Sequence, residues 1–150
     1  MWKLQEEEAA MSAANASTIE APIPATRNTI QKALVLEAVQ SLHDHPTSAD
    51  VYEAVRKKHP NISRATVYRN LGTLATKGEV LKVEVAGGAD RFDFFNKPHY
   101  HAKCNHCGRV FDVDMPYRFD LLNEVADSHG FKIEGHQIMF EGTCEDCQKA

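Results

Sequence analysis

The pattern of apolar and polar positions predicts a helix over residues 27–42, "RNTIQKALVLEAVQSL". Its apolar side chains recur at helical spacing and fall on one side: Ile30, Leu34, Val35, Ala38 and Val39. A second, shorter helix is predicted within residues 45–60, "HPTSADVYEAVRKKHP", where Thr47 or Ser48 serves as N-cap and Pro60 ends it.

A third helix is predicted in residues 61–78, "NISRATVYRNLGTLATKG", capped by Ser63 and ended by Gly78. Its apolar side follows the spacing of Val67, Leu71 and Leu74. The opposite side is small, polar and basic, with Tyr68 on its flank: Ala65, Thr66, Arg69, Gly72 and Thr73. This pattern fits a helix that contacts DNA, and it also fits an ordinary core helix with a solvated outer face.

Two strands around a glycine turn are predicted next, in "EVLKVEV" (79–85) and "DRFDF" (90–94). Three helices followed by a hairpin form a winged helix-turn-helix, in which the third helix enters the major groove and the hairpin leans on the DNA backbone. The sequence therefore predicts a DNA-binding domain over residues 25–95.

The last third of the chain changes in character. Strands are predicted in "HYHAKC" (99–104) and "GRVFDVD" (108–114), and a final strand or strand pair in 132–144. Between them, residues 115–130 are predicted to form a helix whose inward side chains are Phe119, Leu122, Val125 and Ala126. A three-stranded sheet with one helix leaves exposed edges and a thin core, so we expect residues 96–150 to form a homodimer.

Charge is divided unevenly along the 150 residues, whose net charge is −4. Residues 25–85 carry nine Lys and Arg against six Asp and Glu, whereas residues 1–24 and 86–150 are acidic. The predicted DNA-binding segment is thus the basic one. No apolar run approaches the ~20 residues that span a bilayer, and the N-terminal arm (residues 1–24) lacks a secretory signal pattern. These features predict a cytoplasmic protein with no membrane partner.

Four cysteines form two Cys-x-x-Cys pairs: Cys104, Cys107, Cys144 and Cys147. Each pair spans one edge of a tetrahedron, which favours a closed structural Zn²⁺ site that clamps the end of the sheet onto its start. Gly108 suits the tight turn that lets backbone amides face the sulfurs. The alternative is a dithiol redox switch or buried, unreactive thiols.

A second set of ligands mixes imidazoles with carboxylates: His45, Asp93, His99, His101 and Asp112. His99 and His101 share one face of a predicted strand, and nitrogen and oxygen ligands in this ratio suit Fe(II), Mn(II) or Zn(II). The alternative is a polar strand edge without a metal. The remaining histidines are interpreted as surface or cap residues: His43, His59, His106, His129 and His136.

Several motifs together resemble the ferric uptake regulator family over about four-fifths of the chain, Arg27 to Cys147. They are "HPTSADVYEAV", "SRATVYRNLGTL", "RFDF", "HYHAKCNHCG" and "CEDC", in that order. The resemblance implies an α+β fold in which a winged helix-turn-helix precedes a small dimerisation domain. It also implies that the cysteines hold structural zinc and that the second set holds a regulatory Fe(II) or Mn(II).

Within that family the sequence is most similar to the peroxide-responsive repressors. Asp93 and Asp112 stand where the iron regulators tend to carry glutamate, and ligands of an additional metal site fall here on Pro98 and Tyr100. The resemblance implies DNA contacts from Arg27, in the minor groove, and from Tyr68 and Arg69. One departure is Lys32, where an arginine is common, and it puts a phosphate contact in doubt.

The resemblance implies a metal-dependent repressor that binds operator DNA as a homodimer and senses peroxide, without enzymatic activity or a small organic ligand. The alternative within the class is a repressor that senses metal concentration alone. Outside the class, two histidines and a carboxylate also fit a non-haem iron oxygenase, and the zinc site also fits a protein-binding adaptor.

Overall fold

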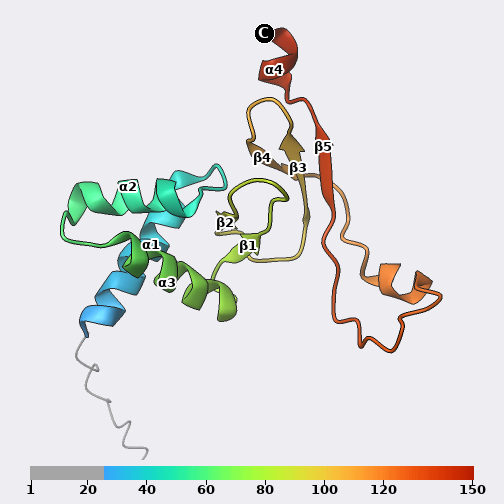
Figure 1. The fold of residues 1–150 in the computed structure, drawn as a ribbon, viewed down its shortest axis with the longest axis horizontal. Helices are drawn as coiled ribbons and strands as arrows, with labels where there is room; N and C mark the ends of the chain where they lie inside the picture. The colour runs from blue at the N-terminus through green and yellow to red at the C-terminus, as the bar shows by residue number, and fades with distance from the viewer. Residues whose placement is uncertain (1–25) are drawn as a thin grey trace, which may run out of the picture.

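The computed structural model describes residues 26–150, and the predicted N-terminal arm lies outside them. Three helices come first, α1 (Arg27–Leu42), α2 (Ser48–Lys58) and α3 (Arg64–Thr76). The antiparallel hairpin of β1 (Leu81–Val83) and β2 (Arg91–Asp93) follows and lies between the helices and the second sheet (Figure 1). The predicted order of three helices and a hairpin is confirmed.

Side-chain caps fix where these helices begin. Thr47 caps α2 through a capping box, in which its hydroxyl accepts from Asp50 N and the Asp50 carboxylate accepts from Thr47 N. Ser63 caps α3 in the predicted way by accepting from Thr66 N. The second helix ends at Lys58, slightly before the predicted stop at Pro60. The α2 cap is of special interest because Thr47 lies two residues after His45.

The helices and the hairpin share one apolar core. Its fully buried members include Val35, Val51, Val67, Leu71 and Leu74, and Phe92 of β2 packs on the same cluster. Each such side chain contributes about 1.5–3 kcal/mol when fully buried. Ile30, predicted to face inward, is 49% exposed because it lies in the first turn of α1, before that helix meets its neighbours.

A three-stranded sheet forms the other part of the molecule, as predicted, in the order β4-β3-β5. β3 (Tyr100–Cys104) pairs antiparallel with β4 (Val110–Val113), which sets His101 opposite Asp112. It pairs parallel with β5 (Met139–Gly142), which sets Cys104 opposite Gly142. A short helix, α4 (Glu145–Lys149), ends the chain.

The helix predicted over residues 115–130 is wrong. Only a short 3₁₀ helix, η1 (Phe119–Glu124), forms there. It lies within a returning segment (residues 114–138), which connects β4 to β5 in sequence and projects away from the sheet (Figure 1). Phe119 is 74% and Val125 44% exposed, so these two side chains, predicted to face inward, remain largely uncovered by the described residues. A helix of that length is marginal without a face on which to pack.

We call residues 26–95 the helical half and residues 96–150 the sheet half. Apolar contacts join the two: Val83 of β1 and Val85, which follows that strand in the hairpin, pack on Val110 of β4, with Met139 of β5. In the part of the chain that the structure describes, no helix has the length and apolarity needed to cross a membrane. The halves therefore meet over a small apolar contact, and polar groups contribute to their alignment.

Candidate metal centres

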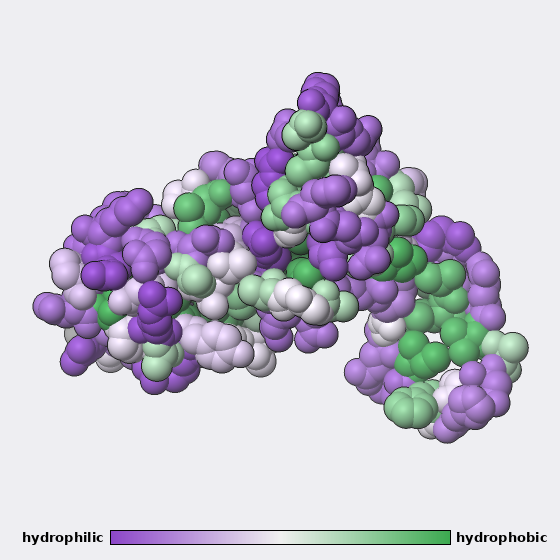
Figure 2. Space-filling view, turned by 45° about the horizontal axis from the view of Figure 1, so that its top comes forward, coloured by the Kyte–Doolittle hydropathy of each residue, from purple (hydrophilic) through white to green (hydrophobic). Residues whose placement is uncertain are grey.

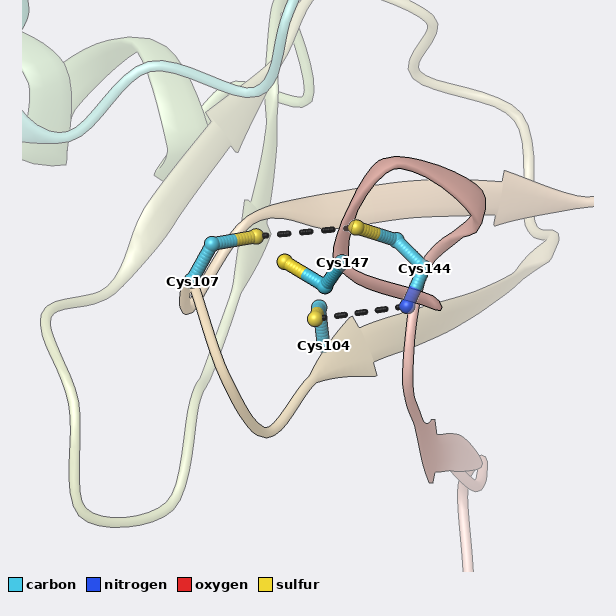
Figure 3. A group of neighbouring side chains, drawn as sticks. All are labelled: Cys104, Cys107, Cys144 and Cys147. Carbon is cyan, nitrogen blue, oxygen red and sulfur yellow. Dashed lines mark hydrogen bonds between the residues drawn. The ribbon is translucent and has the colours of Figure 1, made fainter. Parts of the chain in front are cut away.

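The four cysteines converge at the end of the sheet, although 36 residues separate the two pairs in sequence. Cys104 ends β3, Cys107 lies in the turn that follows, and Cys144 and Cys147 lie at and within α4 (Figure 3). Their sulfurs are all within 4.8 Å of one another. The parallel pairing of β3 with β5 brings the late pair beside the early one.

The spacing of the thiols fits a tetrahedral ion and excludes a disulfide. Cys107 Sγ and Cys144 Sγ lie 3.8 Å apart, far beyond the ~2.05 Å of a disulfide bond. Sulfurs bound to one ion at ~2.3 Å in a tetrahedron are separated by about 3.8 Å. The cluster therefore has the dimensions of a four-thiolate zinc site.

Hydrogen-bond donors around the sulfurs favour thiolates. Backbone amides of Cys107 and Cys144 donate toward Cys104 and lower the pKa of its thiol to about 5. The Arg109 guanidinium, 3.4 Å from Cys107 Sγ, holds the pKa of that thiol below its usual value. Cys147 has its pKa raised to about 12, first by its neighbour Cys144. Three sulfurs in close contact with a fourth favour its protonated form unless a cation balances their charge.

Gly108 allows the turn that holds the first pair. Its φ is +71°, in the left-handed region, and its N–H donates to the Cys104 carbonyl at 2.9 Å. In the reverse direction, Cys104 N donates to the Arg109 carbonyl at 2.9 Å. The turn predicted from the glycine is confirmed.

The five members of the second ligand set also converge: His45, Asp93, His99, His101 and Asp112. One ligand atom from each lies within 4.8 Å of all the others. Asp112 Oδ1 is 2.8 Å from His45 Nε2 and 2.9 Å from His99 Nε2. The set takes His45 and Asp93 from the helical half and the other three from the sheet half, so it lies across the junction between them.

Two of the ligands, His99 and Asp93, are oriented by a hydrogen bond of their other polar atom. The His99 ring is oriented by a 2.7 Å hydrogen bond from Nδ1 to the Lys97 carbonyl, which leaves Nε2 directed at the cluster. Asp93 Oδ1 accepts from Phe95 N at 2.8 Å, which leaves Oδ2 directed inward. His99 lies just before β3 rather than on the predicted strand, yet it still joins His101.

Two buried atoms in this set lack a hydrogen bond. They are Asp93 Oδ2 and His101 Nε2, which lie 3.7 Å apart, too far to bond each other. Burying a polar atom without a partner costs about 1–3 kcal/mol, so such atoms are rare unless they bind something else. The residues present therefore fit a bound cation, and their nitrogen and oxygen donors suit Fe(II) or Mn(II).

Charges within the set perturb its titration. Burial would lower the pKa of His45, but the carboxylates of Asp93 and Asp112 outweigh burial and raise it. For Asp93, burial would raise the pKa, but the imidazoles of His101 and His45 and the Phe95 amide hold it well below its usual range. His45 and Asp93 thus stabilise each other's charged forms, and a metal ion bound at the set would displace the proton of His45.

His136, which sequence reasoning placed on the surface or at a cap, is half-buried in an aromatic cluster. Its Nε2 is 2.8 Å from the Tyr100 hydroxyl, and its ring stacks on Tyr117 with centroids 4.6 Å apart. The Tyr100 hydroxyl also accepts from Arg118 N. This cluster ties the returning segment to β3, and no local pattern in the sequence marks it because its members come from distant segments.

The side chains expected to contact DNA lie on the surface of the helical half. Tyr68 is 65% exposed on α3, and Arg69 and Arg27 are exposed as well. Lys32 lies beside them but is paired with Glu79 at 2.9 Å. With Arg69 and Lys77, Lys32 also lines a hollow between α1 and α3. The outer face of α3 is therefore polar, basic and accessible, as predicted.

A family model described as "Ferric uptake regulator family" matches residues 24–141. The chain is 37% identical over 123 residues to the peroxide operon regulator of Bacillus subtilis (strain 168), covering 82% of this chain and 85% of that protein. It is 34% identical over 123 residues to the peroxide-responsive repressor PerR of Staphylococcus saprophyticus, covering 81% and 82%.

Solved structures with the same fold include two at 25% identity or slightly above. The ferric uptake regulator Fur of Helicobacter pylori, described as having three functional metal binding sites, matches with a TM-score of 0.67, 25% identity and 83% coverage of each chain. The peroxide stress regulator of Campylobacter jejuni matches with a TM-score of 0.64 and 26% identity, covering 81% of this chain and 91% of that one.

Proposed function

Because this chain belongs to the ferric uptake regulator family, we propose that it is a metal-dependent repressor that binds operator DNA as a dimer and senses peroxide. In this proposal the four cysteines hold structural Zn²⁺, and the set of His45, Asp93, His99, His101 and Asp112 holds Fe(II) or Mn(II). The proposed role is regulatory rather than enzymatic.

One observation carries the proposal: a single set of ligands joins the helical half to the sheet half. His45 Nε2 from the helical half lies 2.8 Å from Asp112 Oδ1 on β4. The direct polar contact between these carboxylates and imidazoles weakens when the carboxylates are protonated or the imidazoles are oxidised. The relative position of the two halves then depends on what occupies the set.

The helical half, residues 26–95, is the proposed DNA-binding domain. Its third helix presents Tyr68 and Arg69 on an accessible, basic face, which fits insertion into a major groove. Arg27 begins α1, is exposed and is proposed to reach the minor groove. Because Lys32 is paired with Glu79, its phosphate contact is proposed to require breaking that ion pair.

The sheet half, residues 96–150, is the proposed dimerisation domain. Its returning segment exposes Phe119, Val125, Phe131 and Ile133. Figure 2 shows apolar surface gathered on this segment. Large exposed apolar surfaces mark interaction sites, and the edges of β4 and β5 lack a neighbouring strand among the described residues. A second copy covering this surface would align two α3 helices with two DNA half-sites.

Peroxide sensing is proposed to depend on the imidazoles. When bound, Fe(II) would provide the redox centre at which peroxide is activated beside His45, His99 and His101. In the net reaction one ring carbon gains an oxygen atom while peroxide is reduced to water. The ring nitrogens of an oxidised imidazole are poor donors, so the set no longer holds the halves together.

The proposal is tested by measuring DNA affinity as a function of metal and peroxide. DNA duplexes are first selected from a random-sequence pool with the Mn(II)-loaded protein. Removal of the weakly held metal should lower affinity about 5- to 150-fold with zinc retained, and Mn(II) or Fe(II) should restore it. If no sequence is enriched under any metal condition, the repressor assignment is wrong.

Peroxide separates the two repressor types. Stoichiometric peroxide should release DNA from the Fe(II) form, add one oxygen to a peptide containing His45, His99 or His101, and leave the Mn(II) form bound. A repressor that senses metal concentration alone, as the similarity to a Fur structure would also allow, keeps its DNA in both forms. DNA loss with all three histidines unchanged would contradict the histidine-oxidation mechanism.

A further inference from the structure

The side chain of Arg91 joins the loops that carry the two metal sites. We call residues 43–47 the histidine loop and residues 104–109 the thiol loop. Arg91 Nη1 donates to the His45 carbonyl at 3.2 Å, and Nη2 donates to the Gly108 carbonyl at 2.9 Å. One planar guanidinium therefore spans from a residue of the regulatory set to the residue that follows Cys107.

Both carbonyls belong to residues in the left-handed region. His45 has φ +50° and Gly108 has φ +71°. For a residue with a side chain, such as His45, this conformation costs about 1–3 kcal/mol and persists only when its surroundings fix it. Because Arg91 holds the His45 carbonyl, it contributes to fixing the backbone from which the imidazole projects.

The histidine loop follows β2 closely, so the position of Arg91 and that of the loop are linked. Phe92 N donates to the Pro46 carbonyl at 2.9 Å, and Thr47 forms an isolated antiparallel bridge with Arg91. A shift of Arg91 therefore moves the histidine loop in two ways: through the backbone contacts of β2 and through the hydrogen bond of the guanidinium.

On its other side Arg91 meets a loop that a thiolate-bound ion would make rigid. The backbone bonds between Gly108 and Cys104 and between Cys104 and Arg109 close the thiol loop, and its two cysteines belong to the zinc set. Binding an ion to the thiolates fixes the direction of the Gly108 carbonyl, which is one of the two acceptors of Arg91.

Apart from the contact of His45 with Asp112 inside the regulatory set, the other side-chain hydrogen bonds between the halves avoid both loops. Lys103 Nζ donates to the Ala86 carbonyl at 3.3 Å, and Gln137 Nε2 donates to the Glu84 carbonyl at 3.1 Å. Within residues 26–150, no carboxylate lies within ion-pair distance of Arg91. Its hydrogen bonds to the two carbonyls are thus its principal polar contacts.

We propose that Arg91 is a positioning residue that couples the two metal sites, so that the ion held by the thiolates supports the His45 geometry and the regulatory ion in turn alters the thiol loop. This inference rests on the proposed function of the two ligand sets. Coupling of this kind is reciprocal: if one ion changes the affinity for the other, the reverse effect is equal. Damage to the zinc site would then lower regulatory metal affinity.

Two variants and one control test the coupling. Arg91→Gln removes the positive charge and the planar guanidinium that donates from two nitrogens. Arg91→Lys keeps the charge, but its single ammonium cannot hold two carbonyls in the same geometry. Lys103→Gln removes a comparable hydrogen bond between the halves while touching neither loop. All are produced with Co(II) in the thiolate site and washed with a mild chelator to empty the regulatory set.

Mn(II) is then titrated while two signals are followed. Electron paramagnetic resonance of free Mn(II) gives regulatory affinity, and the thiolate-to-cobalt charge-transfer band reports the geometry of the thiol loop. In the wild type and in Lys103→Gln, Mn(II) should bind and shift the band. In Arg91→Gln and Arg91→Lys, affinity should fall about 10- to 100-fold, the effect typical of groups that orient a ligand, and the band should stay in place at saturation.

The inference is overturned if Arg91→Gln and Arg91→Lys bind Mn(II) as the wild type does, or if the band shift persists in them at saturation. It is also overturned if wild-type Mn(II) binding leaves the cobalt band unmoved. If Arg91→Gln fails to fold, Arg91→Lys alone decides. A wild type that binds no Mn(II) would instead contradict the proposed function, and the coupling would fall with it.

Discussion

At the residue scale, His45 combines features that are individually uncommon. It is 7% exposed, takes a left-handed backbone conformation and places Nε2 3.3 Å from Asp93 Oδ2 and 2.8 Å from Asp112 Oδ1. A buried imidazole between two carboxylates is favourable when protonated, or when a metal ion takes the place of the proton. His45 is therefore the side chain at which protons and metal ions compete most directly.

Mn(II) affinity should weaken as pH falls through the raised pKa of His45. The ion must displace this proton while Asp93, Asp112, His99 and His101 face the same position, so affinity should drop by up to about tenfold per pH unit for each proton released. Titration of Mn(II) between about pH 6 and 8 by electron paramagnetic resonance measures this. An affinity that does not change over that range would contradict the competition.

In the metal-free protein, the contribution of His45 to folding stability changes with pH in the opposite direction. Because the folded-state pKa of His45 lies above its unfolded value, its contribution to stability is fully present below about pH 6.5 and is lost as pH rises through the folded pKa. The apo and metal-loaded forms should thus respond to pH in opposite directions. Urea denaturation of both forms across the same range serves as the internal control.

The spacing of residues in the sequence identifies some of these ligands clearly and others only weakly. His99 and His101 are adjacent enough to be paired by spacing, and the two Cys-x-x-Cys pairs are recognisable alone. His45 lies in a loop far from the others in sequence, so spacing gives it the weakest support of the five, and the family resemblance strengthens its place in the set. Arg91 and His136 are missed because their roles depend on backbone carbonyls and ring stacking between distant segments.

At the element scale, the α2 cap is proposed to support the histidine loop. Thr47→Ala removes the capping box two residues after His45 and should lower the free energy of unfolding by about 1 kcal/mol. It should also weaken Mn(II) binding about tenfold, the lower end of the effect of groups that orient a ligand. Urea denaturation and Mn(II) titration measure the two effects.

Ser63→Ala is the matched control, since it removes the same kind of cap from α3, away from both ligand sets. It should cost a similar free energy of unfolding while leaving Mn(II) affinity unchanged. Equal losses of metal affinity in both variants would mean that general destabilisation, and not the position of the histidine loop, controls binding.

Local periodicity predicts the helices that carry their own caps and a shared core, as α2 and α3 do. It fails over residues 115–130, where helical spacing occurs but, within residues 26–150, Phe119 and Val125 stay exposed. The parallel pairing of β3 with β5 also cannot be predicted from the local sequence, because its register is set by contacts between segments more than 30 residues apart.

At the scale of the whole molecule, the two ligand sets have different positions and therefore different proposed consequences. The thiol set closes the end of the sheet, within one half. The His and Asp set spans both halves, next to the small apolar contact of Val83, Val85 and Val110. Loss of an ion from the first should damage a fold, whereas loss from the second should release one half from the other.

The most direct test of this account is the Mn(II) dependence of DNA affinity in His45→Ala, compared with the wild type and with His59→Ala, an exposed histidine of the same half. All three proteins are assayed on the duplex selected with the wild type, with zinc content measured alongside. We predict that Mn(II) raises affinity about 5- to 150-fold in the wild type and in His59→Ala and has no effect in His45→Ala, which keeps its zinc. Full Mn(II) stimulation in His45→Ala would contradict the claim that one ion bridges the two halves.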